Sequence, residues 1–335
     1  MNESLSRRGS SLVLLLAVLA LLNAGVLLLH IMMGDFPVPA WDALKTAVGQ
    51  GDARYELVVN RFRLPRALVA CMAGGALALS GVILQGITRN PLAAPGVIGL
   101  NAGAALAVVT ALVLLPSLPV SALPLIAFAG ALLAAAVSYT LAWRRGLSPV
   151  RLVLVGVSVS AVAGAGVTFL LTIGGIGEAR RAIIWMTGSV YGRSWEHLWS
   201  LLPWLALLLP LALLLARQLD VLQLGDELAR GVGSRVEKAR LLLLLISVAL
   251  AGSAVATAGT IGFVGLMAPH MARYIVGPAS HRLMPTAVLL GGLLVMLADL
   301  IGRTALKPIE IPCGIIIALV GAPYMLYLLY TKRNM

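Results

Sequence analysis

The chain has 335 residues, of which 60% are apolar and 11% are charged. Because soluble globular proteins carry about 25% charged residues, this composition excludes an ordinary soluble domain and indicates a membrane protein. A spanning helix takes about 20 apolar residues, so the length predicts about ten spans in a single transmembrane domain over residues 1–335. The net charge of +12 then indicates basic cytoplasmic loops, and we expect no nucleic-acid partner.

Nine apolar runs are long enough to span a membrane. They cover about 11–33, 64–88, 95–115, 121–143, 148–173, 198–216, 241–258, 283–301 and 311–330. The first run is longer than the core of a signal peptide, which has about 7 to 15 residues, and it lacks a cleavage site of small residues. We therefore expect it to be retained as a spanning helix.

The stretch 259–277, GTIGFVGLMAPHMARYIVG, is interrupted by Gly, Pro, His and Arg and is unlike a lipid-facing helix. Arg7 and Arg8 precede the first run, and Lys332 and Arg333 follow the last one. The positive-inside rule therefore places both termini in the cytoplasm and requires an even number of crossings. We expect 259–277 to cross as a short or broken helix.

The sequence contains no energy-converting site. None of its lysines follows a glycine, so a phosphate-binding GxxxxGK[ST] loop is absent. An ion-driven carrier needs ionisable groups near the bilayer midplane, and Asp299 is the only acidic residue within a predicted span. It lies four residues before Arg303, and this helical spacing predicts an ion pair between them. The histidines and cysteines form no metal-ligand or catalytic pattern, so we expect no cofactor and no metal. An ion-coupled secondary carrier remains the alternative.

The longest cytoplasmic connection contains LQLGDELARGVG at 222–233. Asp226 and Glu227 at its start, Arg230 near its end and Gly233 beyond it predict one short helix whose charges match the helix dipole. A helix held between two spans can transmit motion as a lever. The alternative is a solvated surface helix without such a role.

Basic residues are also numerous on the opposite side of the membrane, more than orientation alone explains. They are Lys45, Arg54, Arg61, Arg63, Arg66, Arg180, Arg181, Arg193, Arg303 and Lys307. An acidic partner outside the cytoplasm would account for them. Pairing with nearby acidic residues of the same chain is the alternative.

Five segments in a fixed order resemble a known family. They are RLPR at 63–66, QGITRNPLAAPGVIG at 85–99, LGDELARGVG at 224–233, GTIGFVGLMAPHMAR at 259–273 and AD…R…EIPCG over 298–314. Together they resemble the FecCD-type permeases of bacterial iron-siderophore and cobalamin ABC importers. Within that family, TGSVYGRSW at 187–195 looks most similar to iron(III) dicitrate permease subunits.

The resemblance implies an all-α polytopic membrane protein with the type II ABC importer permease fold, in the bacterial inner membrane. It implies a second permease subunit, identical or related, two cytoplasmic ATPase subunits that bind ATP and Mg, and a periplasmic substrate-binding protein. The implied cargo is a ferric chelate, a siderophore or iron-dicitrate, moved from periplasm to cytoplasm. Cobalamin and haem are the alternatives within the family.

The resemblance also assigns roles to individual residues. Arg63, Arg66 and Arg303 correspond to arginines that dock carboxylates of the binding protein, as guanidinium groups can do in bidentate fashion. The residues implied to couple to the ATPase are Leu224, Gly225, Asp226, Glu227, Arg230 and Gly233. The residues implied to form a cytoplasmic gate are Asn90 and Leu92, with Pro149 and Val150 where SPV at 148–150 departs from the family pattern.

Overall fold

The computed structural model describes residues 2–144, 146–306 and 308–332, with side chains from 11 to 331 within these ranges. Its regular structure is helical, apart from one isolated bridge between Trp143 and Leu147. The helices are α1 (Asn2–Met32), α2 (Ala40–Ala47), α3 (Ala53–Glu56), α4 (Leu64–Thr88), α5 (Leu100–Leu114), α6 (Leu123–Ala142), α7 (Pro149–Ile173), α8 (Ile176–Met186), α9 (Trp195–Leu214), α10 (Ala216–Gln223), α11 (Asp226–Gly231), α12 (Val236–Ala258), α13 (Val264–Val276), α14 (Ser280–Thr304) and α15 (Cys313–Lys332). A π-helical segment η1 (Leu57–Arg63) and two 3-10 turns, η2 (Pro95–Ile98) and η3 (Val120–Ala122), complete them.

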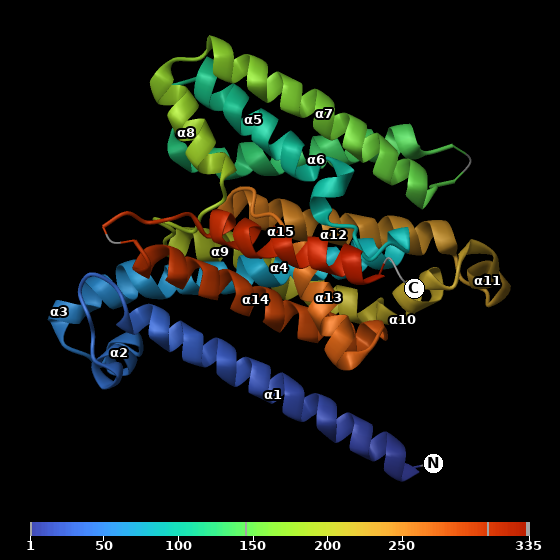
Figure 1. The fold of residues 1–335 in the computed structure, drawn as a ribbon, viewed down its shortest axis with the longest axis horizontal. Helices are drawn as coiled ribbons and strands as arrows, with labels where there is room; N and C mark the ends of the chain where they lie inside the picture. Colours follow the sequence, from blue (N-terminus) through green and yellow to red (C-terminus); the bar gives the residue numbers. More distant parts are fainter. Residues whose placement is uncertain (1, 145, 307, 333–335) are drawn as a thin grey trace.

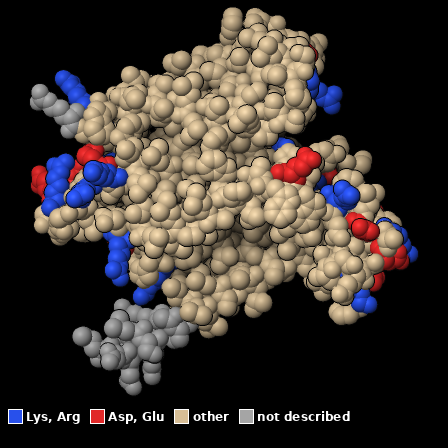
Figure 2. Space-filling model, turned by 180° about the vertical axis from the view of Figure 1, so that it is seen from behind, with Lys and Arg blue, Asp and Glu red and all other residues tan. Residues whose placement is uncertain are grey.

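Eight helical segments in the described part of the chain are long and apolar enough to cross a membrane, and α5 is a shorter apolar helix. Together with α13 they correspond to the ten predicted spans, so the predicted all-helical polytopic fold is confirmed. The stretch 259–277 does form a short helix, α13. Figure 2 shows the charged side chains at the two ends of the molecule and an uncharged belt between them on this face.

Both termini lie at the same end of the bundle as α10 and α11, whereas α2, α3 and α8 lie at the opposite end (Figure 1). This arrangement agrees with an even number of crossings. The side chains of Arg7, Arg8 and Lys332, and the whole of Arg333, lie outside the described residues.

The run 95–115 was predicted as one helix, and this prediction is wrong. The 3-10 turn η2 occupies its start, and Gly99 then adopts a φ of +85° before α5 begins. A left-handed residue cannot continue an α-helix, so the apolar run is divided without any change in its hydropathy. Helices α2, α3 and α8 were not predicted, because they are short and do not span the belt.

Helices α4, α12 and α14 are the most buried of the eight long spanning segments in the described part of the chain. About four fifths of the most apolar part of α4 (83%) and α12 (78%) is buried, compared with 17% for α1. No hydrophobic force drives helices together in lipid, so their association depends on close van der Waals packing. Small residues allow this packing, because they let two helix backbones approach each other. A Cβ added at Gly81 of α4 would collide with the carbonyl oxygen of Gly265 in α13, and one at Gly74 would collide with the carbonyl oxygen of Gly291 in α14.

The same order of helices occurs twice. A long helix, a non-helical break, a short helix and two long helices follow each other from α4 to α7 and again from α12 to α15. The two series run in opposite directions along the bundle: α4 ends near α11, whereas α12 begins there (Figure 1). This is the arrangement of an inverted repeat.

Candidate functional site

A pocket of about 490 Å³ opens at the end of the bundle that carries α2, α3 and α8. We call it the arginine pocket, because its lining includes Arg61, Arg63, Arg66, Arg193 and Arg303, with Asp35 and Glu310 as the only acidic residues among the described residues that line it. Outside the spans, burial lowers the pKa of the Arg193 guanidinium below its ordinary value.

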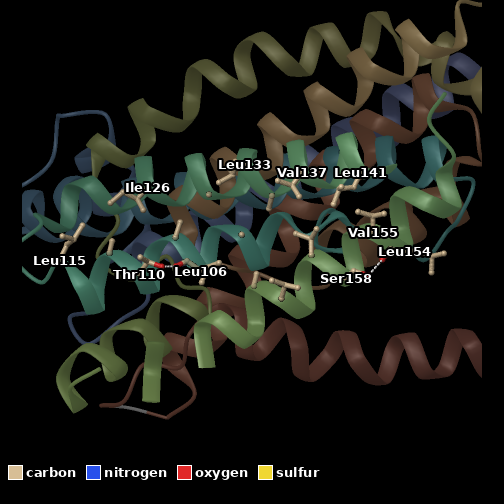
Figure 3. Close-up of a pocket in the computed structure, with 18 residues that line it drawn as sticks. Leu106, Thr110, Leu115, Ile126, Leu133, Val137, Leu141, Leu154, Val155 and Ser158 are labelled. Carbon is tan, nitrogen blue, oxygen red and sulfur yellow. Dashed lines mark hydrogen bonds between the residues drawn. The ribbon is translucent and has the colours of Figure 1, made fainter. Parts of the chain in front are cut away.

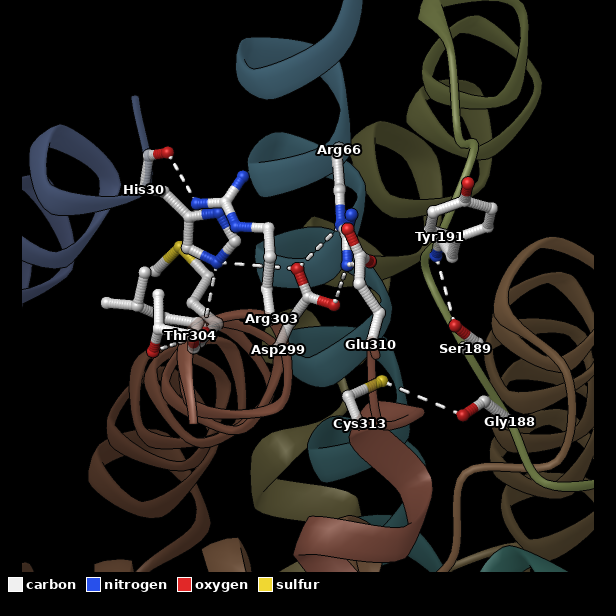
Figure 4. Close-up of polar contacts among 12 residues, drawn as sticks. His30, Arg66, Gly188, Ser189, Tyr191, Asp299, Arg303, Thr304, Glu310 and Cys313 are labelled. Carbon is white, nitrogen blue, oxygen red and sulfur yellow. Dashed lines mark hydrogen bonds and ion pairs between the residues drawn. The ribbon is translucent and has the colours of Figure 1, made fainter. Parts of the chain in front are cut away.

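Arg66 makes the central ion pair of this pocket. Its Nε donates to Oδ2 of Asp299 over 2.8 Å and its Nη2 to Oδ1 over 2.9 Å, in the bidentate geometry that favours a guanidinium and a carboxylate. The Asp299 carboxylate is 1% exposed. Nη2 also lies 2.8 Å from Oε2 of the more exposed Glu310, and the Tyr191 ring lies over the guanidinium (Figure 4).

The predicted ion pair between Asp299 and Arg303 is wrong. Figure 4 shows Asp299 facing Arg66, with Nε2 of His30 at 3.6 Å, while Nη2 of Arg303 donates to the carbonyl oxygen of His30 over 2.7 Å. The carbonyl groups in the last turn of α1 have no partner within their own helix, and Arg303 supplies one. Arg66, from α4, is therefore the arginine that neutralises Asp299.

Arg63 also donates hydrogen bonds to backbone carbonyl groups at and just after the C-terminal end of α1. Its Nη1 donates to the carbonyl oxygen of Ile31 over 2.7 Å, and its Nη2 donates to that of Phe36 over 2.6 Å. The structure thus brings the three predicted docking arginines together around one pocket. However, Arg63, Arg66 and Arg303 are each at most 8% exposed and each already has a partner within the chain. Arg61, which the sequence did not single out, is exposed beside them.

The predicted coupling helix is shorter than 222–233. Gly225 has a φ of +104° and separates α10 from α11, so the prediction of one continuous helix is wrong. The charges are where the sequence placed them: Asp226 and Glu227 lie in the first turn of α11, and Arg230 lies in its last turn. Gly233 follows with a φ of +81°, which agrees with its predicted role in ending the helix.

The segment around α11 exposes apolar side chains outside the uncharged belt. Leu224, Leu228 and Val232 are all more than half exposed, with Leu228 at 63%. Leu224 and Leu228 also line a pocket of about 410 Å³ together with Arg89 and Glu227. Exposed leucines on a short surface helix are typical of a contact with another protein.

The predicted gate residues lie at the same end of the bundle. Asn90 Oδ1 accepts a hydrogen bond from the backbone N–H of Leu92 over 2.9 Å, which forms a tight turn directly after α4. Pro149 is the first residue of α7, and Val150 beside it is exposed, as is Leu92. The turn after α4 and the start of α7 therefore each expose one apolar side chain, Leu92 and Val150, at this end of the bundle.

The two helix breaks meet at a pocket of about 280 Å³ in the bundle. Gly96 and Val97 line it from the first break, and Ile261 and Gly262 from the second. Irregular backbone at membrane depth is tolerated where it lines a cavity, and broken helices of this kind form the binding regions of many transporters.

A cavity of about 930 Å³ forms a groove between α5, α6 and α7 (Figure 3). Its lining is almost wholly apolar, and the hydroxyl groups of Thr110 and Ser158 are bonded to backbone carbonyls of their own helices. A groove without available polar groups cannot recognise a polar solute, so its size does not make it the transport site. No group of three or more His, Cys, Asp or Glu side chains in the described ranges is placed to hold a metal ion.

A bundle whose spanning helices are broken beside an internal pocket, with polar sites at both ends, defines a multi-pass membrane transport protein. The chain belongs to the FecCD transport family, which matches residues 17–331. It is the transmembrane, non-catalytic component of an ABC transporter, and the predicted family is confirmed.

The chain is 43% identical over 319 residues to the Fe(3+) dicitrate transport system permease protein FecD of Escherichia coli, covering 95% of this chain and 99% of that one. It is 42% identical over 323 residues to the iron(3+)-hydroxamate import system permease protein FhuG of Bacillus subtilis, covering 94% and 96%. A solved structure assigned to a metal-chelate type ABC transporter in an inward-facing conformation matches with a TM-score of 0.85 and 30% identity, over 94% of this chain and 98% of that one.

Proposed function

We propose that this chain forms the membrane path of an importer that carries a ferric chelate from the periplasm to the cytoplasm, in the bacterial inner membrane. The observation that supports this most strongly is the pair of exposed leucines, Leu224 directly before α11 and Leu228 within it, in a chain without a nucleotide-binding loop. The two relatives named above, one for iron dicitrate and one for an iron hydroxamate, support an iron chelate as the cargo. Their nearly equal identities do not favour either chelate.

The end that carries both termini, α10 and α11 is the cytoplasmic one in this proposal. Two ATPase subunits bind there, each receiving one α11, and they hold ATP and Mg. The exposed Leu224 and Leu228 would fill an apolar cleft of the ATPase, and the pocket beside Glu227 would accommodate one of its side chains.

A periplasmic binding protein docks at the opposite end. Five arginines and two acidic residues line the arginine pocket, so a positive excess remains there even with Asp299 buried behind it. In this proposal Arg63, Arg66 and Arg303 hold the shape and potential of the pocket. The exposed Arg61 and the Glu310-facing side of Arg66 receive the carboxylates of the binding protein.

A second permease subunit, a copy of this chain or a relative, completes the path. Asn90 and Leu92, with Pro149 and Val150, would form the cytoplasmic constriction together with the same segments of that subunit. The exposure of Leu92 and Val150 supports this, since both apolar side chains need a partner outside the chain.

The test is uptake of iron-55 chelates, and of cobalamin labelled with radioactive cobalt, into vesicles that contain the complex purified with its co-purifying partners. We expect uptake that needs ATP and the binding protein, that persists with ionophores, and that selects among ferric dicitrate, a ferric hydroxamate, haem and cobalamin. Accumulation by the chain alone under a proton or sodium gradient would instead establish an ion-coupled carrier.

A further inference from the structure

Asp226, the first residue of α11, is bonded to arginines from two other helices. Its Oδ1 accepts from Nη2 of Arg89 over 2.8 Å and from Nη2 of Arg240 over 2.7 Å. Arg89 ends α4, and Arg240 lies in the second turn of α12. The carboxylate thus joins α11 to two helices of the buried interior.

Arg89 connects α11 to the first predicted gate segment. It directly precedes Asn90 and adopts a φ of +52°, uncommon for a residue with a side chain, where α4 ends and the turn begins. A shift of Asp226 therefore acts on the residue that sets the direction of the turn at Asn90 and Leu92. The two bonded residues are 137 positions apart in the sequence.

Arg240 connects α11 to the second predicted gate segment. Its Nη1 donates to the carbonyl oxygen of Leu147 over 2.7 Å and to Oε1 of Glu237 over 3.3 Å. Oε2 of Glu237 accepts from the backbone N–H of Leu147 over 3.3 Å. Both backbone groups of Leu147, two residues before Pro149, are therefore held by this cluster.

We infer that Asp226 and Arg240 form the connection through which movement of α11 reaches both cytoplasmic gate segments at once. The inference rests on the proposed coupling and gating roles and names the residues that link them. The Arg240 side chain is 2% exposed, so its bonds to Asp226 and Leu147 are little screened by water. A planar guanidinium holds two partners in a fixed geometry, so it cannot keep both bonds if one partner moves alone.

One hydrogen-bond donor of this cluster is left unpaired. Nε of Arg240 is buried and has no hydrogen-bond partner among the described residues. A buried donor without an acceptor is unfavourable, so a second arrangement of α11 that supplies an acceptor can lie close in free energy to this one. Two arrangements of similar free energy are what a switching element needs.

The test uses the complete reconstituted importer and the substitutions Arg240→Lys and Asp226→Asn. Arg235→Lys is the control, because Arg235 is exposed on the same connection and outside the cluster. We expect both test variants to retain the ATPase subunits and to hydrolyse ATP. Chelate imported per ATP hydrolysed should fall about tenfold, as expected when one charge-assisted hydrogen bond is lost, whereas the control keeps the wild-type ratio.

A second measurement covers the case in which Arg240→Lys does not fold. Spin labels at Gly231→Cys and Pro91→Cys report the distance between α11 and the first gate segment, because both positions are exposed and neither is a predicted coupling or gate residue. With Asp226 intact, α11 and the gate segment should move together, so ATP should leave this distance unchanged. With Asp226→Asn, α11 should move without the gate segment, so ATP should change the distance. Wild-type transport ratios in the variants that fold, or a distance that ATP leaves unchanged with Asp226→Asn, would overturn the inference. Absence of ATP-driven uptake in the wild-type importer would instead refute the proposed function.

Discussion

The Arg66–Asp299 pair gives a prediction whose size follows from its geometry. Two charge-assisted hydrogen bonds of 2.8 and 2.9 Å join side chains that are 9% and 1% exposed. Removing one member of such a buried pair costs about 3–5 kcal/mol, because the other charge stays buried without its partner. We therefore expect Arg66→Met to lower the free energy of unfolding by this amount.

Asp299→Leu should cost less than Arg66→Met, nearer the lower limit of about 3 kcal/mol. Arg66 would still have Glu310 at 2.8 Å, whereas Asp299 without Arg66 would have only the imidazole of His30, at 3.6 Å, within ion-pair distance among the described residues. The double variant replaces the pair by apolar groups, so we expect a coupling energy of about 2 kcal/mol between the two positions.

The assay is unfolding by SDS in mixed micelles, followed by far-UV circular dichroism, for the two single variants and the double variant. A second cycle with Asp299→Leu and Arg303→Met is the control, because Arg303 bonds to the carbonyl oxygen of His30 instead. Its coupling energy should be less than half that of the first cycle. A coupling energy below about 0.5 kcal/mol for Arg66 and Asp299, or a larger one for Arg303, would refute the assignment of partners.

Three further outcomes are expected. Gly81→Ala should lower the melting temperature in detergent, because the collision with α13 costs about 1–3 kcal/mol of the free energy of unfolding. Gly164→Ala should leave the melting temperature unchanged, because a Cβ there has no neighbour within 4 Å; equal shifts for the two variants would contradict the packing argument. Leu228→Asp should reduce co-purification of the ATPase about tenfold without loss of the folded subunit, and full retention would argue against α11 as the contact. Arg61→Glu should slow association of the binding protein about tenfold and weaken its salt dependence, as measured by surface plasmon resonance; an unchanged rate would exclude Arg61 from docking.

Hydropathy was sufficient for the spans, because the thickness of the bilayer fixes their length whatever their packing. It could not locate the breaks. Gly99 and Gly225 both interrupt predicted helices by adopting a positive φ, yet many other glycines of the chain remain inside helices. Whether a glycine bends the backbone or allows close packing depends on its neighbours in space, which the sequence does not order.

The partners of the charged residues also depend on neighbours in space that the sequence does not reveal. The sequence assigned Asp299 to Arg303 because helical spacing reveals only local partners. Its actual partner, Arg66, is 233 positions away. The basic composition predicts cytoplasmic loop charges in general, whereas Arg240 is one of the largest fully buried side chains among the described residues. An arginine at the edge of an apolar run, directly before 241–258, was the one signal of that burial.

Arg66 and Arg240 occupy related places in the two inverted halves. Each lies within the first five residues of the central helix of its half, α4 or α12, and each pairs with an aspartate, one at either end of the bundle. The partners differ in a way that matters for function. Asp299 belongs to the buried part of α14, so its pair is fixed, whereas Asp226 begins a six-residue helix on the surface and is 28% exposed. A buried arginine can therefore hold the end with the arginine pocket rigid through Arg66 and allow the end with α11 to move through Arg240. With α11 in the cytoplasm, as proposed above, this is the asymmetry that an importer driven from the cytoplasm requires.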